Sequence, residues 1–175
     1  MKRNLILFLA VLATLTSCTN NDNPNNVNLS ESDIAGVWNV TDILQEGTAT
    51  TTIFGEEIVS TFTNSGRDYN FTYDFQTDPN TITADGSYIS TISITVDGQT
   101  QTEEVFVTTV DGFSAGSWSL NGNILTVTAN GETNDAAISE YDGNRMVIRV
   151  EYFIEFAEQG ISVVNEGVLT MTVER

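Results

Sequence analysis

Few side chains of this 175-residue sequence could carry out chemistry, because it contains no histidine and one cysteine. Histidine is the commonest general base and metal ligand, so a Ser-His-Asp triad and a zinc site of Cys and His are excluded. Paired carboxylates remain, and Glu151 and Glu155 would share one face of an extended strand. That face is most simply solvent, and the neighbouring pairs at 56–57 and 103–104 point to opposite faces. We therefore predict that the chain is not an enzyme and uses no cofactor.

Clusters of Asp, Asn and Gly offer oxygen atoms that calcium could bind, at 22–26, 121–123 and 142–144. None of them approaches the loop of an EF-hand, in which acidic and amide ligands alternate before a final glutamate. Tight turns require the same residue types. We predict turns at the last two positions and no metal site.

The one thiol, Cys18, lies where an apolar segment meets an Asn-rich segment. Residues 1–3 include two positive charges, and the apolar run at 5–15 is too short to span a bilayer core about 30 Å thick. This arrangement predicts a secretion signal at residues 1–17. Residues 15–18 read LTSC, which resembles the lipobox of bacterial lipoproteins. The alternative is an unpaired thiol beside an ordinary signal peptide.

The lipobox resemblance implies that the chain is cut before Cys18 and that this cysteine carries a lipid. Acyl chains on Cys18 would hold the protein at the outer membrane of the cell envelope, on a face that the sequence does not indicate. The residues that follow are polar and Asn-rich, so residues 18–33 are predicted to be the lipidated cysteine and a disordered tether. One domain without a disulfide is predicted at 34–175.

The chain is strongly acidic. Its formal charge is −18, and this becomes −20 when Lys2 and Arg3 leave with the signal. A field of this sign repels nucleic-acid phosphates and anionic lipid headgroups. We therefore expect no nucleic-acid partner and membrane contact only through the lipid, and the question of a protein partner stays open.

From residue 34 onward, apolar and polar side chains alternate with the period of two that is typical of β-strands. The clearest runs lie at 69–75, 88–96, 144–156 and 167–175. Asp-Gly and Asn-Gly pairs that favour hairpin turns lie at 84–86, 96–98, 110–112, 120–123, 130–132 and 141–144. Eight to ten strands without a helix to cover them must close on themselves. We predict an all-β, antiparallel up-and-down meander barrel, with a β-sandwich as the alternative.

Two Gly-x-Trp motifs each begin a predicted strand: Gly36 with Trp38, and Gly116 with Trp118. A glycine two residues before a tryptophan leaves space on the same face of the strand, which the indole or a neighbouring backbone can fill. Large aromatic side chains dominate protein cores, so we predict a structural role for both motifs.

These motifs, together with the NILTVT run at 123–128, resemble those of the lipocalin-like lipoproteins of Bacteroidetes. The resemblance covers about residues 34–175 and implies a lipocalin-like barrel. In lipocalins the first-strand tryptophan packs at the closed end of the barrel beneath an arginine of a late strand. The resemblance would assign that part to Arg145 or Arg149.

The resemblance also implies that the barrel binds one small apolar or amphipathic molecule. The candidate ligand-binding residues are Tyr69, Phe71, Tyr73, Phe75, Tyr88 and Tyr152. The same rings could instead fill the barrel. In that case the alternative function is a non-enzymatic accessory or adhesive module that acts through its outer surface. Residues 47–66 correspond to the lipocalin loop at the barrel mouth, so we expect a hairpin that turns at 54–57 and covers the mouth as a lid.

Overall fold

The computed structural model describes residues 29–108, 115–158 and 161–175, which form one short helix and nine strands. The helix is α1 (Glu31–Ile34). The strands are β1 (Gly36–Ile53), β2 (Glu56–Gln76), β3 (Thr81–Val96), β4 (Gln99–Val107), β5 (Ala115–Asn121), β6 (Ile124–Ala129), β7 (Glu132–Tyr141), β8 (Arg145–Glu158) and β9 (Ile161–Glu174). The predicted signal segment, Cys18 and residues 19–28 of the predicted tether lie outside the described residues.

All nine strands belong to one antiparallel sheet. Their order is β2-β1-β9-β8-β7-β6-β5-β3-β4, and a further pairing of β2 with β3 closes the sheet into a ring of every strand except β4. Consecutive strands are neighbours, apart from β5, which pairs with β3 instead of β4. The predicted all-β meander barrel is therefore confirmed, and the sandwich alternative is wrong because there is a single closed sheet.

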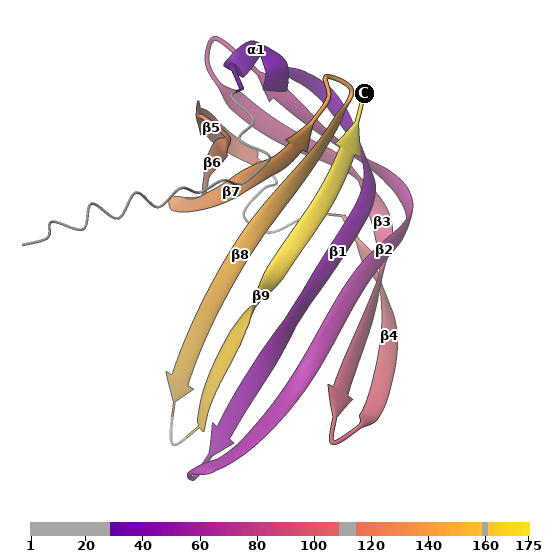
Figure 1. Ribbon diagram of the computed structural model, residues 1–175, viewed down its shortest axis with the longest axis vertical. Coiled ribbons are helices and arrows are strands. Elements are labelled where there is room, and N and C mark those ends of the chain that lie inside the picture. Colours follow the sequence, from indigo (N-terminus) through magenta and orange to yellow (C-terminus); the bar gives the residue numbers. More distant parts are fainter. Residues whose placement is uncertain (1–28, 109–114, 159–160) are drawn as a thin grey trace, which may run out of the picture.

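The barrel is closed near α1 and open along one side at its other end (Figure 1). In the open half, β4 pairs with β3 alone, and β8 beyond Arg149 pairs with β9 alone within the described part of the chain. The open half comprises β4 and residues 47–65, 90–96, 150–158 and 161–167, and the closed half is the rest of the described residues. Figure 1 shows the long strands of the open half extending past the short strands β5, β6 and β7.

The hydrophobic core fills the closed half. Its largest fully buried side chains include Trp38, Phe71, Tyr73, Phe75, Ile82, Leu125, Ile138, Met146 and Ile148. The aromatic rings pack edge to face, with ring centres 5.4 Å apart for Phe71 and Tyr73 and 5.7 Å apart for Phe75 and Trp118. This packing stabilises one end of a barrel that has no disulfide.

A bulge in β1 changes which residues of this strand face inward. The register with β9 shifts between Val40 and Asp42, so that Val40 and Ile43 are both buried in the core. Beyond the bulge, Gln45 and Gly47 lie on the inner face of the sheet. Strict alternation from the start of the strand would have turned both outward.

A second bulge has the same effect in β2. The register with β3 shifts between Arg67 and Asn70, and Asp68 within the bulge has a φ of 54°. As a result, Phe62 and Asn64 face inward in the open half, opposite Gly47 and Gln45 of β1.

The predicted turn at 84–86 is wrong, because these residues lie within β3. Gly86 has a φ of 109°, and a Cβ atom there would lie 1.8 Å from the carbonyl oxygen of Asn70. Glycine is therefore required for the close approach of β3 to the bulge in β2. The turn predicted at 110–112 lies outside the described residues.

Residues before the predicted boundary at 34 also pack against the barrel. Leu29 packs against the core, and Ser30 precedes the single turn of α1 with its backbone N–H donating to the Asp33 carboxylate at 2.8 Å. Ile34 is fully buried, and the Trp38 indole donates to its carbonyl at 2.7 Å. Residues 29–33 therefore belong to the domain and not to the tether.

Arg175 closes this end of the barrel over Trp38. Its guanidinium carbon lies 4.0 Å from the centre of a Trp38 ring, which is a cation–π contact. The same guanidinium donates to the carbonyl oxygens of Asp33 at 2.6 Å and Ala35 at 3.0 Å. One side chain thus joins the end of β9 to β1 and to α1.

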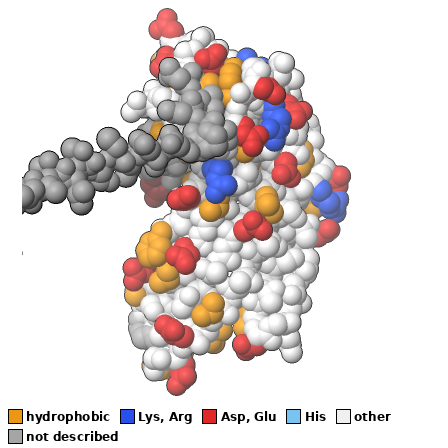
Figure 2. All heavy atoms as spheres, viewed as in Figure 1, with side chains coloured by type: hydrophobic (Ala, Val, Ile, Leu, Met, Phe, Trp, Pro, Cys, Tyr) orange, Lys and Arg blue, Asp and Glu red, His pale blue; other side chains and the backbone are white. Residues whose placement is uncertain are grey.

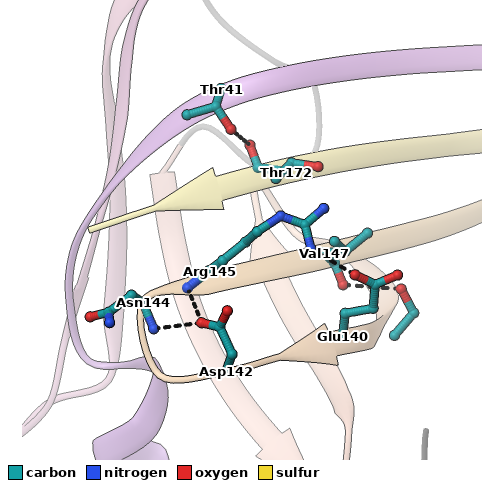
Figure 3. Close-up of polar contacts among 8 residues, drawn as sticks. Thr41, Glu140, Asp142, Asn144, Arg145, Val147 and Thr172 are labelled. Atoms are coloured by element: carbon teal, nitrogen blue, oxygen red, sulfur yellow. Dashed lines mark hydrogen bonds and ion pairs between the residues drawn. The ribbon is translucent and has the colours of Figure 1, made fainter.

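The expectation that Arg145 or Arg149 would lie over this tryptophan is wrong. Arg145 donates to Glu140 at 2.6 Å beside the turn between β7 and β8 (Figure 3), and Arg149 is exposed. In the same turn, the Asp142 carboxylate accepts the backbone N–H groups of Asn144 at 2.9 Å and Arg145 at 2.8 Å. These donors hold the pKa of Asp142 below its usual range.

The two Gly-x-Trp motifs differ in how they use glycine. A Cβ atom at Gly116 would lie 2.1 Å from the carbonyl oxygen of Thr128, so a neighbouring backbone does fill its space. Gly36 instead lies in open space with a φ of 119°, which favours glycine for conformational reasons. Trp38 and Trp118 are both buried, as a structural role requires.

Candidate functional site

Five of the six aromatic residues predicted to bind a ligand pack inside the closed half. Phe71, Tyr73, Phe75 and Tyr88 are at most 5% exposed, and Tyr69 stacks on Tyr88 with ring centres 5.6 Å apart. None of these five lines the cavity described below. Five of the six predicted residues therefore lie in the packed core, as in the other interpretation of the sequence, and Tyr152 alone lines the cavity.

Two hydroxyl groups in this layer of rings differ in their partners. The Tyr69 hydroxyl accepts the backbone N–H of Ile43 at 2.7 Å, whereas the buried Tyr73 hydroxyl has no hydrogen-bond partner in the described part of the chain. Burial raises the pKa of both phenols. Both groups therefore stay protonated at neutral pH and act as structural side chains.

A cavity of about 350 Å³ lies on the inner face of the open half. Five strands, β1, β2, β3, β8 and β9, contribute its lining: Gln45, Ala49, Ser60, Phe62, Ile92, Ile94, Tyr152, Ile154 and Asn165. None of these side chains is charged, and the polar ones are amides and hydroxyls. A largely apolar cavity of this size with a few polar groups is typical of a small-molecule site.

The floor of the cavity is a row of residues that runs across the sheet. Strand register places Tyr152, Gly167, Gly47 and Phe62 side by side on β8, β9, β1 and β2. A Cβ atom at Gly167 would lie 2.6 Å from the Tyr152 hydroxyl oxygen, and one at Gly47 would lie 2.7 Å from the tip of the Phe62 ring. The two glycines therefore let the two rings lie flat over the backbone.

A chain of polar side chains leads to the deep end of the cavity. The Ser90 hydroxyl, almost fully buried, donates to the Asn64 side-chain oxygen at 2.5 Å. The Asn64 amide nitrogen in turn donates to the Gln45 side-chain oxygen at 3.3 Å. The Gln45 oxygen thereby accepts one hydrogen bond, and the Gln45 side chain lies near the Tyr152 hydroxyl.

Tyr152 is the one predicted ligand-binding residue that lines the cavity. Its hydroxyl oxygen is buried without a hydrogen-bond partner in the described part of the chain. Burial raises the pKa of this phenol, while the nearby Gln45 side chain lowers it, although the geometry between them is not that of a hydrogen bond. The hydroxyl is therefore a protonated donor without an acceptor.

The inner face beyond the cavity carries many apolar side chains toward the free ends of the strands. Its exposed apolar side chains are Ile53, Ile58, Ile94, Val105, Ile154, Phe156 and Ile161. Strand register places four exposed polar residues on the same face: Glu56, Gln99, Gln101 and Glu103. A second hollow of about 360 Å³ lies beside the turn between β3 and β4 and shares Ile94 with the cavity. The cavity thus continues toward the open end as a trough, which is mainly apolar on β8 and β9 and is bordered by polar side chains of β4.

The expected lid over the mouth is a wall of the cavity. Residues 47–66 do form a hairpin, with its turn at Phe54 and Gly55. However, β1 pairs with β9 as far as Ile53, and β2 pairs with β3 from Ser60 onward. Because this hairpin is paired on both sides, it extends the barrel and does not fold over it.

The carboxylates considered at the outset do not line the cavity, although Glu103 pairs with Ile92 of the lining. Glu151 and Glu155 are exposed on the outer face of β8, on the side of the strand opposite Tyr152. Figure 2 shows acidic side chains spread over the outer face of the long strands, with fewer basic ones among them. Within the described residues, no three Asp or Glu side chains are grouped so that they could hold a metal ion.

Three further residues of the site, Gln45, Asn64 and Asn165, did not stand out in the sequence. Each is a polar residue next to another polar residue in a strand, and its inward position depends on the bulges or on strand register. The available signal was the pair Gly47 and Gly167, since glycine inside a strand marks close approach of another group.

Comparison with known proteins gives no further assignment, because no family model, no curated protein and no solved structure matches the chain. In the described part of the chain, no helix has the length and hydropathy needed to cross a membrane.

Proposed function

We propose that this chain is a lipid-anchored protein of the bacterial cell envelope whose half-open barrel binds one small apolar or amphipathic molecule. The observation that carries the proposal is the uncharged cavity of about 350 Å³, which five strands line and which continues into a trough with many exposed apolar side chains. An exposed concave apolar face of this kind is unfavourable in water unless something covers it. A ligand in the cavity would remove that surface from water.

The role we propose is binding and not catalysis. The lining offers amides, hydroxyls and apolar groups, and it contains no carboxylate that could act as a general acid or base. The acidic pairs of the sequence lie outside this lining: Glu151 and Glu155 are on the outer face, and the pairs at 56–57 and 103–104 are at the tip of β2 and on the exposed strand β4.

The proposed anchor fits the direction in which the cavity opens. The described chain starts at Leu29, just before α1 at the closed end, whereas the free ends of the long strands lie at the opposite end of the domain (Figure 1). The exposed apolar side chains of the trough extend to these free ends. A lipid on Cys18 would therefore attach the domain by its closed end, through residues 19–28. The open end would be left free to take up a molecule.

Native mass spectrometry of the full chain, purified gently from cell extract, tests the proposal. We expect an added mass of a few hundred daltons that denaturation releases, whereas a lipid on Cys18 is covalent and stays. Ala49→Trp, which fills the cavity, should abolish the releasable mass. Val59→Trp, on the exposed outer face of the same hairpin, is the matched control and should keep it.

A chain without releasable mass, even after exposure to a lipid and metabolite extract, would contradict the binding proposal. The second candidate, a module that acts through its outer surface, would then lead. It is favoured by a shallow depression of about 530 Å³ on the outer face, between Thr48, Glu151, Phe153 and Glu166, in which Phe153 is 64% exposed. Phe153→Ser should then reduce capture of a partner protein.

A further inference from the structure

We infer that the molecule bound in the cavity is uncharged and carries an oxygen atom that accepts a hydrogen bond from Tyr152, as the head of a fatty alcohol, an ester or an amide does. This inference rests on the proposed function and specifies the chemical class of its ligand.

The Tyr152 hydroxyl is a hydrogen-bond donor that the fold leaves unused. The Tyr152 hydroxyl is buried among the cavity residues and donates to nothing in the described part of the chain. Buried hydroxyl groups are almost always hydrogen-bonded, because they lose their water when they are buried. An acceptor atom brought by a ligand would restore the bond that folding leaves unmade.

The hydrogen bonds of the neighbouring Gln45 amide run in one direction. Ser90 donates to Asn64, and Asn64 donates to the side-chain oxygen of Gln45. In this direction the Gln45 oxygen already accepts one hydrogen bond, while the N–H groups of Gln45 remain donors. The deep end of the cavity therefore presents donors from both Tyr152 and Gln45, which match an oxygen acceptor.

The cavity has no positively charged side chain that could pair with an anionic ligand. The arginines of the described residues lie elsewhere: Arg67 bonds Asp68 and Glu104, Arg145 bonds Glu140, Arg175 covers Trp38, and Arg149 is exposed on the outer face. A carboxylate in the cavity would be desolvated without a cation, in a chain whose formal charge is −18. Fatty-acid anions should therefore bind worse than uncharged molecules of the same length.

The test is displacement of N-phenyl-1-naphthylamine, an uncharged fluorescent probe, from the full chain. The competitors have equal chain length: 1-decanol, decanoate, decyltrimethylammonium and decane. We expect decanol to displace the probe at the lowest concentration. Tyr152→Phe should weaken the binding of decanol roughly three- to tenfold, as expected for one lost hydrogen bond, and should leave the binding of decane unchanged. Tyr73→Phe is the matched control, because it removes the other buried, unpartnered hydroxyl outside the cavity.

This experiment distinguishes a failure of the inferred ligand class from a failure of the proposed binding function. If the probe binds but decanoate competes as well as decanol, or if Tyr152→Phe leaves decanol unchanged, the inference is overturned and the binding function stands. If neither the probe nor any competitor binds the unsubstituted chain, the proposed function fails and the inference fails with it.

Discussion

At the scale of single residues, two glycines shape the floor of the cavity. Gly47 and Gly167 face each other across β1 and β9. Neither has a positive φ, so conformational freedom is not the reason for glycine at these positions. The reason is space: the rings of Tyr152 and Phe62 lie where side chains would otherwise stand. The position of the Tyr152 hydroxyl therefore depends on the residue opposite it.

We expect Gly167→Ala to destabilise the domain by about 1–3 kcal/mol, the usual cost of overpacking. The new Cβ atom would lie 2.3 Å from the carbonyl oxygen of Glu46 and 2.6 Å from the Tyr152 hydroxyl, so backbone or ring must shift. Chemical denaturation followed by circular dichroism measures the change. Ser162→Ala, on the same strand, is the control and should stay within about 0.5 kcal/mol. Equal stability of Gly167→Ala and the control would show that the floor is not tightly packed.

The carboxylate of Asp142 should make the stability of the fold depend on pH. Because two backbone N–H groups lower its pKa below 3.8 in the folded chain, the charged carboxylate stabilises the fold above that pH. This contribution is lost as the pH falls through the lowered pKa. We expect the stability advantage of the unsubstituted chain over Asp142→Asn to be present at pH 7 and to shrink below about pH 3.8.

Denaturation of both chains at several pH values measures this difference. Glu132→Gln, at an exposed carboxylate of the same strand pair, serves as the control. An advantage that does not change with pH would mean that the charge of Asp142 contributes nothing to the turn.

At the scale of elements, the sequence predicted the strands well and their inner faces poorly. Alternation at 69–75 correctly predicted a strand with Phe71, Tyr73 and Phe75 on one face. It could not predict the bulge before them, which is set by pairing with β3, and so the inward position of Asn64 was missed. Periodicity also identifies an apolar face without showing whether that face is packed or hollow.

The hairpin at 47–66 was likewise predicted as a hairpin but given the wrong position. Its residues alternate equally well in a lid and in a wall, and only long-range pairing with β9 and β3 distinguishes the two. The contact of Arg175 with Trp38 was missed for the same reason, since 137 positions separate the two residues and local pattern carries no signal for it.

The helix α1 depends on the contacts of Arg175. A single helical turn is not stable alone, and here Arg175 holds the carbonyl groups of Asp33 and Ala35. We expect Arg175→Ala to destabilise the domain by about 1–3 kcal/mol, from the lost cation–π contact and two charged hydrogen bonds. Hydrogen exchange should rise most at residues 30–36. Arg149→Ala, at an exposed arginine, is the control, and equal exchange in both variants would contradict the role of Arg175.

At the scale of the whole molecule, the excess of negative charge opposes compact folding. The chain has 24 acidic and 6 basic residues, and few ion pairs offset the repulsion among the described residues. Salt shortens the range of such repulsion from about 30 Å at 0.01 M to about 8 Å at 0.15 M. The stability of this fold should therefore depend on ionic strength.

We expect Tm at pH 7 to rise by about 2–4 °C between these two salt concentrations, which corresponds to about 1 kcal/mol for a domain of this size. Differential scanning calorimetry measures the shift. Near pH 4.1, where the sequence has its isoelectric point, the same change in salt should have little effect. A shift of the same size at both pH values would assign it to another effect of the salt.

The pairing of β1 with β9 also sets the order in which the barrel can form. The register runs from Asn39 with Glu174 to Ile53 with Ile161, so the first strand, which pairs with β2 on its other side, gains its second neighbour only after the last strand has been synthesised. Contacts between such distant parts of a chain form slowly. Hairpins can appear early, but the ring cannot close on a nascent chain. A slow final closure would keep the polypeptide extended during translation, which is the state in which the proposed signal segment would deliver it across a membrane.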